Sequence, residues 1–170
     1  MNQGGAMPLI FGIPVHPPAA HFPIAGAAFG AAALVVAAWL TSRGKAEMSG
    51  PWRWAGVLLL AVALLGIPVL IWSGRAWAIG LDDLVPGSLL PKPDAEDGIL
   101  YRHALSAGAT FVAVLVAFPL AWAARDPKKP VLAAAVAAVV AAVLIGLTGH
   151  LGGTMVHKPA GAPAEAPSKG

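Results

Sequence analysis

The chain has 170 residues, of which 58% are hydrophobic and only 11% are charged, with a mean hydropathy of +0.74. A soluble domain usually carries about 25% charged residues, so this composition predicts that lipid solvates most of the surface. The sequence contains no cysteine, which excludes disulfides, iron–sulfur clusters and c-type haem attachment through cysteine. The net charge of +3 does not indicate nucleic-acid binding, because the basic residues flank apolar runs and form no stripe with aromatic side chains.

Four apolar stretches match the length of a membrane-spanning helix, which needs about 20 residues. They cover approximately residues 22–40, 54–73, 101–124 and 131–150. The central part of each stretch contains no Asp, Glu, Lys or Arg. We therefore predict an all-α fold, an integral membrane four-helix antiparallel bundle formed by residues 1–157. Residues 158–170 are rich in Ala, Pro and Lys, and we expect them to form a disordered C-terminal tail.

Glycine and proline residues add detail to the predicted helices. Gly26 and Gly30 have the GxxxG spacing that lets another membrane helix approach closely. Pro23 suits the first turn of the first helix, where a missing backbone N–H costs nothing. Pro68 lies inside the second stretch and is expected to kink or locally break that helix.

The distribution of charge predicts an orientation in the membrane. The short connections 41–53 and 125–130 together hold six Lys or Arg residues and two acidic residues, whereas the 73–99 connection holds two basic and five acidic residues. Short loops rich in Lys and Arg usually face the cytoplasm. We therefore expect a multi-pass protein of the bacterial inner membrane with both termini in the periplasm.

All five histidines are predicted to lie at one end of the bundle. His16 and His21 precede or begin the first helix, His103 opens the third, and His150 and His157 end the fourth. In an antiparallel bundle these positions share one membrane face, which the charge distribution makes the periplasmic one. Imidazole is a common ligand of haem iron and of metal ions, so this face is the predicted functional site.

The surroundings of the histidines suggest individual roles. Prolines flank His16 and His21, which restrains the backbone, and glycines around His150 would admit a flat ligand or a neighbouring helix. Gly152 could alternatively form a helix C-cap. Arg102 and Arg75 stand at the membrane boundary, where each could pair with a haem propionate or anchor a lipid phosphate.

These features predict a b-type haem held without covalent bonds and ligated by two of His21, His103 and His150. His16 and His157 would then support the ligands or the propionates. The sequence shows no nucleophile–base pair and no phosphate-binding glycine loop, so an electron-transfer subunit is favoured over a stand-alone enzyme. Two alternatives remain open: a histidine-lined site for a copper, zinc or iron ion, and a structural subunit of a respiratory or photosynthetic complex without a cofactor.

The motif His-Pro-x-x-x-His-Phe-Pro at 16–23, the histidine that opens the third helix, and Gly-His-x-Gly-Gly at 149–153 resemble DUF family 2231. The resemblance covers approximately residues 14–157 and implies a four-helix bacterial membrane protein. Members fused to c-type cytochrome domains imply respiratory electron transfer with haem b, and therefore a c-type cytochrome or a larger redox complex as partner. The motifs match His16, His21, His103 and His150, whereas His157 departs from the family pattern, in which an aromatic residue usually stands there.

Overall fold

The computed structural model describes the backbone of residues 9–10, 13–14, 16–78 and 98–157, and the side chains of residues 19–73 and 98–154. Four long helices account for most of this part of the chain: α1 (His16–Ser42), α2 (Gly50–Ala78), α3 (Ile99–Ala123) and α4 (Leu132–His157). Each contains a segment that is long and apolar enough to cross a membrane. The prediction of a four-helix membrane bundle is therefore confirmed. The predicted C-terminal tail, 158–170, lies outside the described residues.

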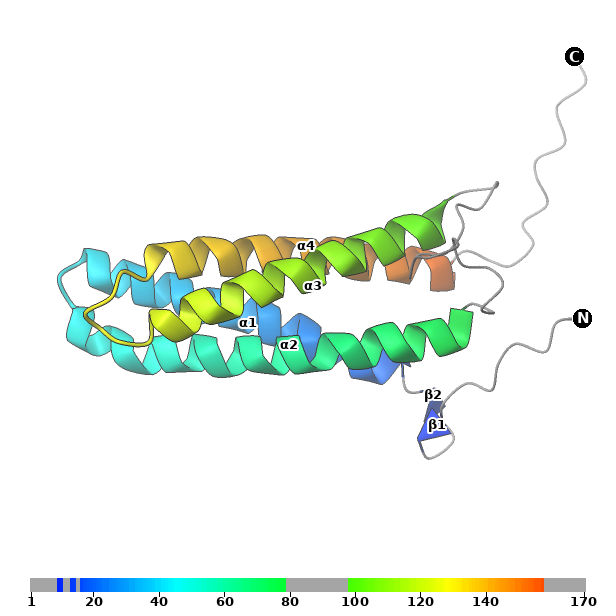
Figure 1. The fold of residues 1–170 in the computed structure, drawn as a ribbon, viewed down its shortest axis with the longest axis horizontal. Helices are drawn as coiled ribbons and strands as arrows, with labels where there is room; N and C mark the ends of the chain where they lie inside the picture. Colours follow the sequence, from blue (N-terminus) through cyan, green and yellow to red (C-terminus); the bar gives the residue numbers. More distant parts are fainter. Residues whose placement is uncertain (1–8, 11–12, 15, 79–97, 158–170) are drawn as a thin grey trace, which may run out of the picture.

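Consecutive helices run in opposite directions (Figure 1). α1 packs against α2 and α4, and α3 packs against the same two helices, so α1 and α3 occupy diagonal corners of the bundle. One end, here called the loop end, contains residues 43–49 and 124–131, including the short 3₁₀ helix η1 (Ala46–Ser49). The opposite end, here called the histidine end, brings together the beginnings of α1 and α3 and the ends of α2 and α4.

The helices extend further at the histidine end than the predicted spans. α1 already begins at His16, so Pro17 and Pro18 occupy its first turn, where backbone N–H groups have no partner within the helix. The expectation that Pro23 begins the helix is therefore wrong, and Pro23 lies inside α1. At Pro68 the sequence predicted a kink or a local break; the break is absent, because α2 continues through this residue to Ala78. Before α1, strands β1 (Leu9–Ile10) and β2 (Ile13–Pro14) form a short antiparallel pair in which Ile10 lies opposite Ile13.

The contact between α1 and α2 depends on glycines, as the GxxxG spacing predicts. A Cβ atom on Gly26 would lie 2.6 Å from the backbone oxygen of Leu59, and one on Gly30 would lie 3.3 Å from the Leu59 Cβ. From the other helix, a Cβ on Gly56 would lie 2.6 Å from Leu34 Cγ. Gly26 thus lets the two backbones meet directly, whereas Gly56 leaves room for the Leu34 side chain of the other helix.

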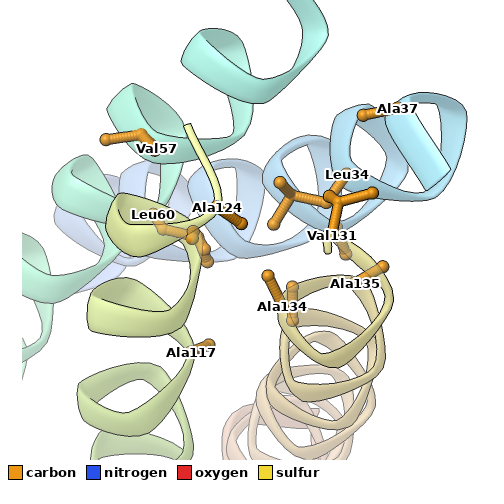
Figure 2. Packing of buried hydrophobic residues seen from close by; sticks show 12 residues of the cluster. Leu34, Ala37, Val57, Leu60, Ala117, Ala124, Val131, Ala134 and Ala135 are labelled. Atoms are coloured by element: carbon orange, nitrogen blue, oxygen red, sulfur yellow. The ribbon is translucent and has the colours of Figure 1, made fainter. Parts of the chain in front are cut away.

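Small side chains fill the interior and large ones face outward. The buried cluster nearest the loop end contains Leu34, Val57 and Leu60 but is otherwise mostly alanine (Figure 2). In contrast, Leu65 is 74% exposed and Leu58 is 62% exposed. In water this distribution would be unfavourable, whereas hydrocarbon tails solvate leucine as well as a protein interior does. The packing therefore agrees with a bundle surrounded by lipid.

Arg53, near the start of α2, is completely buried at the loop end. Its Nη1 donates to the carbonyl oxygens of Ala124, Asp126 and Lys129 at 2.6, 3.0 and 2.9 Å. Its Nε donates to Ser49 Oγ at 2.9 Å and its Nη2 to Thr41 Oγ1 at 3.1 Å. One guanidinium thus connects the end of α1, η1, the beginning of α2 and the turn between α3 and α4.

We expect Gly26→Ala to destabilise the bundle by about 1–3 kcal/mol, because the new methyl group would overlap the carbonyl of Leu59. Gly146→Ala in α4 is the matched control, since nothing lies within 4 Å of a Cβ there and alanine favours the helix. Unfolding of both variants in mixed micelles with increasing denaturing detergent measures the difference. Equal stability of the two variants would contradict the close contact of α1 with α2.

We expect Arg53→Lys to lower the free energy of unfolding by about 2 kcal/mol or more, although the charge is kept. A lysine ammonium has three donors on a flexible stem and cannot replace a planar fork that serves five acceptors. Arg43→Lys is the control, because Arg43 is exposed and stacks on Trp39. Thermal unfolding in detergent should separate the two, and a stable Arg53→Lys variant would refute the structural role of this side chain.

Candidate functional site

A cluster of four polar side chains lies between α3 and α4 toward the histidine end. His103, Ser106 and Thr110 are spaced by three and four residues, which places them on one face of α3. Thr148 approaches them from α4. Polar residues inside apolar helices are rare, face the bundle interior and frequently mark functional positions.

The Thr148 hydroxyl is the centre of this cluster. Its Oγ1 lies 2.7 Å from Ser106 Oγ and 3.1 Å from Thr110 Oγ1, and it donates to the Leu144 carbonyl at 2.9 Å. Each hydroxyl has only one proton, so the contacts share protons, and either oxygen can be the donor between Thr148 and Ser106 and between Thr148 and Thr110. Thr110 is buried, and its Oγ1 donates to the backbone carbonyl oxygen of Ser106 at 2.9 Å. The hydroxyl groups are thus satisfied among themselves and by helix carbonyls.

The hydrogen bond of His103 selects one tautomer of its neutral ring. The Nδ1 atom lies 3.0 Å from the backbone oxygen of Thr148. A carbonyl oxygen only accepts, so Nδ1 must carry a proton and donate it. In the neutral imidazole Nε2 then has a free lone pair, and within the described part of the chain no hydrogen bond engages it. This arrangement, with Nδ1–H directed to a backbone carbonyl, is the one that orients metal-ligating histidines in general.

Gly152 makes room for the His103 imidazole. A Cβ atom on Gly152 would lie 3.1 Å from His103 Cε1 and 3.5 Å from Nδ1. The glycine-rich segment around His150 therefore admits a side chain of the neighbouring helix, which is one of the two uses that the sequence suggested. The alternative use of Gly152 as a helix C-cap is wrong, because α4 continues to His157.

The other predicted site residues do not converge on His103 in the same way. His21 and His150 are exposed, and His150 lies two residues beyond Thr148, about 200° further around α4. It is therefore directed away from the face that meets α3. Arg102 is exposed beside His103 at the beginning of α3. The side chains of His16, Arg75 and His157 lie outside the described residues.

These positions allow a test of whether the chain fits a haem. The described side chains provide one oriented imidazole inside the bundle, together with a guanidinium at its edge. Across residues whose side chains are described, no three His, Asp or Glu residues come close enough to hold a metal ion. The placement therefore fits a single protein ligand at His103, whereas the side chains of His21 and His150 are exposed.

Sequence analysis did not single out Ser106 and Thr110. The signal that would have found them is their spacing from His103, since three polar residues on one face of an otherwise apolar helix require partners on a neighbouring helix. Thr148 directly precedes the Gly-His-x-Gly-Gly motif at 149–153 and is not part of it. Its role depends on the packing of α4 against α3, which brings its hydroxyl to Ser106 and Thr110.

No protein-family model matches the chain, and no match was found among curated proteins or solved structures. The resemblance to DUF family 2231 stays a prediction. A functional proposal therefore has to be argued from the geometry of the described residues.

We expect Thr148→Val to weaken the α3–α4 contact by about 1 kcal/mol, because Ser106 and Thr110 lose their shared partner. Thr154→Val is the control, since the Thr154 hydroxyl bonds only to carbonyls of its own helix among the described residues. The measurement is the free energy of unfolding in mixed micelles. If both variants lose the same amount, the cluster does not stabilise the interface.

Proposed function

We propose that the chain is a membrane-embedded electron-transfer subunit that binds a b-type haem without covalent attachment, with His103 as one of the residues that would ligate its iron. The observation that carries this proposal is the hydrogen bond from His103 Nδ1–H to the Thr148 carbonyl. In the neutral ring this bond puts the lone pair on Nε2, and it holds the ring in one orientation; both are required of an imidazole that binds iron.

Neighbouring residues support the same role. Gly152 leaves space against the edge of the imidazole, and a larger residue there would displace the ring. The Arg102 guanidinium, next to His103 in sequence and exposed at the membrane boundary, would pair with a propionate. When bound, the haem supplies one-electron redox chemistry, while the protein orients it and adjusts its potential.

His103 carries the proposal by itself. Both candidates for the second axial ligand, His21 and His150, have exposed side chains. Each would have to meet the haem from outside the α3–α4 contact, and His16 or His157 would support the propionates. The described placement gives no reason to prefer one of the exposed pair.

The basic connections support an orientation in which the histidine end faces the periplasm. With six Lys or Arg residues against two acidic ones, residues 41–53 and 125–130 favour a cytoplasmic location in a bacterial inner membrane. Electrons would then leave or enter at the periplasmic face. A c-type cytochrome or a larger redox complex is the proposed partner there.

One observation favours a second candidate function. Within the described part of the chain, buried polar side-chain atoms all have hydrogen-bond partners. A histidine whose Nδ1–H is bonded to a neighbouring helix is also what a structural subunit of a respiratory or photosynthetic complex would contain. An isolated copper, zinc or iron ion has less support, because the described side chains gather no three typical ligands.

The deciding experiment is an optical spectrum of the protein purified from its native membrane, with haem quantitation. We expect a Soret band, a reduced-minus-oxidised spectrum of b type, and loss of the low-spin signal in His103→Ala. His21→Ala and His150→Ala identify the second ligand, since its loss should also leave a high-spin or empty site. Gly152→Ala should shift the spectrum without abolishing binding, because it moves the imidazole edge.

Three outcomes would contradict the proposal. A colourless protein with a stoichiometric metal ion would indicate the metal site instead. A colourless protein without metal would favour the structural subunit. A normal low-spin spectrum in His103→Ala would show that the haem is bound elsewhere.

A further inference from the structure

The loop end carries five basic side chains that the proposed electron-transfer role does not use. They are Arg43 and Lys45 in the first connection, and Arg125, Lys128 and Lys129 in the second. Arg125 is half-buried and the other four are exposed. Glu47 and Asp126 are the acidic residues of the same segments, so positive charge prevails.

The two connections form one surface rather than two. Arg53 lies between them and bonds to Thr41 on one side and to the carbonyls of Ala124 and Lys129 on the other. Its donors satisfy backbone oxygens of the turn between α3 and α4, and its own guanidinium is buried. The five remaining cations therefore all belong to one end of the bundle.

Carboxylates in the described part of the chain do not neutralise these cations. Among the described residues none of the five forms an ion pair with a carboxylate. The Asp126 carboxylate accepts the backbone N–H of Lys128 at 2.9 Å, so it stabilises the turn. Arg125 donates to the Trp122 carbonyl and stacks on the Trp122 ring, with its Cζ 4.2 Å from the ring centroid. Five positive charges therefore remain for an external anion.

Tryptophans place this charge at the depth of lipid headgroups. Trp39, Trp52, Trp54 and Trp122 all belong to the loop end and are 45–54% exposed. Indole rings prefer the boundary between headgroups and acyl chains. Arg43 over Trp39 and Arg125 over Trp122 hold guanidinium groups beside that layer.

We propose that the loop end is a binding surface for anionic phospholipids. Arg43, Lys45, Arg125, Lys128 and Lys129 would contact the headgroup phosphates, and the exposed tryptophans would contact the first part of the acyl chains. A basic residue at an anionic bilayer surface contributes about a fivefold factor in affinity, and the effect is screened by salt. This surface is independent of any cofactor at the histidine end.

The experiment uses the protein's own tryptophans as local reporters. The chain has six, and Trp72→Phe with Trp77→Phe leaves the four at the loop end. This double variant is reconstituted in vesicles that contain brominated phosphatidylglycerol or brominated phosphatidylcholine. Bromine quenches the fluorescence of adjacent tryptophan, so the two titrations give the preference for the anionic over the zwitterionic lipid.

We expect a preference of about fivefold or more for phosphatidylglycerol, and its loss at high salt, where the Debye length falls to about 3 Å. Adding Lys45→Gln, Lys128→Gln and Lys129→Gln should reduce the preference by about fivefold or more. Glu47→Gln should strengthen it, because an exposed negative charge is removed from the same surface. Arg102→Gln, at the opposite end, should leave it unchanged.

Equal quenching by the two lipids in the parent protein would overturn the proposal, as would an undiminished preference in the triple lysine variant. Quenching by brominated phosphatidylcholine and the helical circular dichroism signal show whether that variant is folded. If it is not, the salt titration of the parent protein decides alone, and a preference that resists salt would refute an electrostatic surface.

Discussion

The buried guanidinium of Arg53 is the interaction on which the loop end of the bundle depends. A charge away from water is unfavourable unless it is well bonded, and Arg53 directs its donors to five oxygens from Thr41, Ser49 and residues 124–129. These oxygens include the Ala124 carbonyl at the end of α3, which has no partner within the helix. The side chain therefore bonds to the last carbonyl of one helix and to the residue that precedes the next. It also fixes the distance between the two short connections. The four helices extend from this fixed end toward the histidines.

Between the two ends, helix packing is determined by the size of the side chains rather than by hydrophobicity. Alanine and glycine lie inside, while leucine, valine and tryptophan face outward. Lipid gives apolar helices little reason to associate, so close contact and interhelical hydrogen bonds must supply the specificity. Gly26 and Gly56 do this for α1 and α2, and the hydroxyl cluster around Thr148 does it for α3 and α4. The position of His103 is a consequence of the second contact, because both its carbonyl acceptor and the glycine beside it belong to α4.

The two ends differ in chemistry. The histidine end has an imidazole whose Nε2 has a free lone pair, with a guanidinium beside it in sequence, whereas the loop end has cations and indole rings without carboxylate partners among the described residues. A redox cofactor at one end and an anionic lipid layer at the other would be compatible uses of a single bundle. Each depends on a different contact within it. His103 requires α4 to lie against α3, whereas the cationic surface requires Arg53 to hold the connections together.

The sequence by itself determined the fold class, the four spans and the collection of histidines at one end, because long uncharged segments joined by short connections leave little choice of topology in a membrane. It also predicted the glycine contact at Gly26 and Gly30. Only α3 has a polar face in its sequence, formed by His103, Ser106 and Thr110. The apolar sequences around His21 in α1 and His150 in α4 do not reveal how those helices are rotated, so the sequence did not determine which histidine faces inward. Only the packing of α3 against α4 showed that His103 is enclosed while His21 and His150 are exposed. In the sequence, Arg53 is likewise only one of the basic residues of a short connection. Its burial depends on carbonyl oxygens about 70 residues away in the chain, which it contacts only once the bundle has formed.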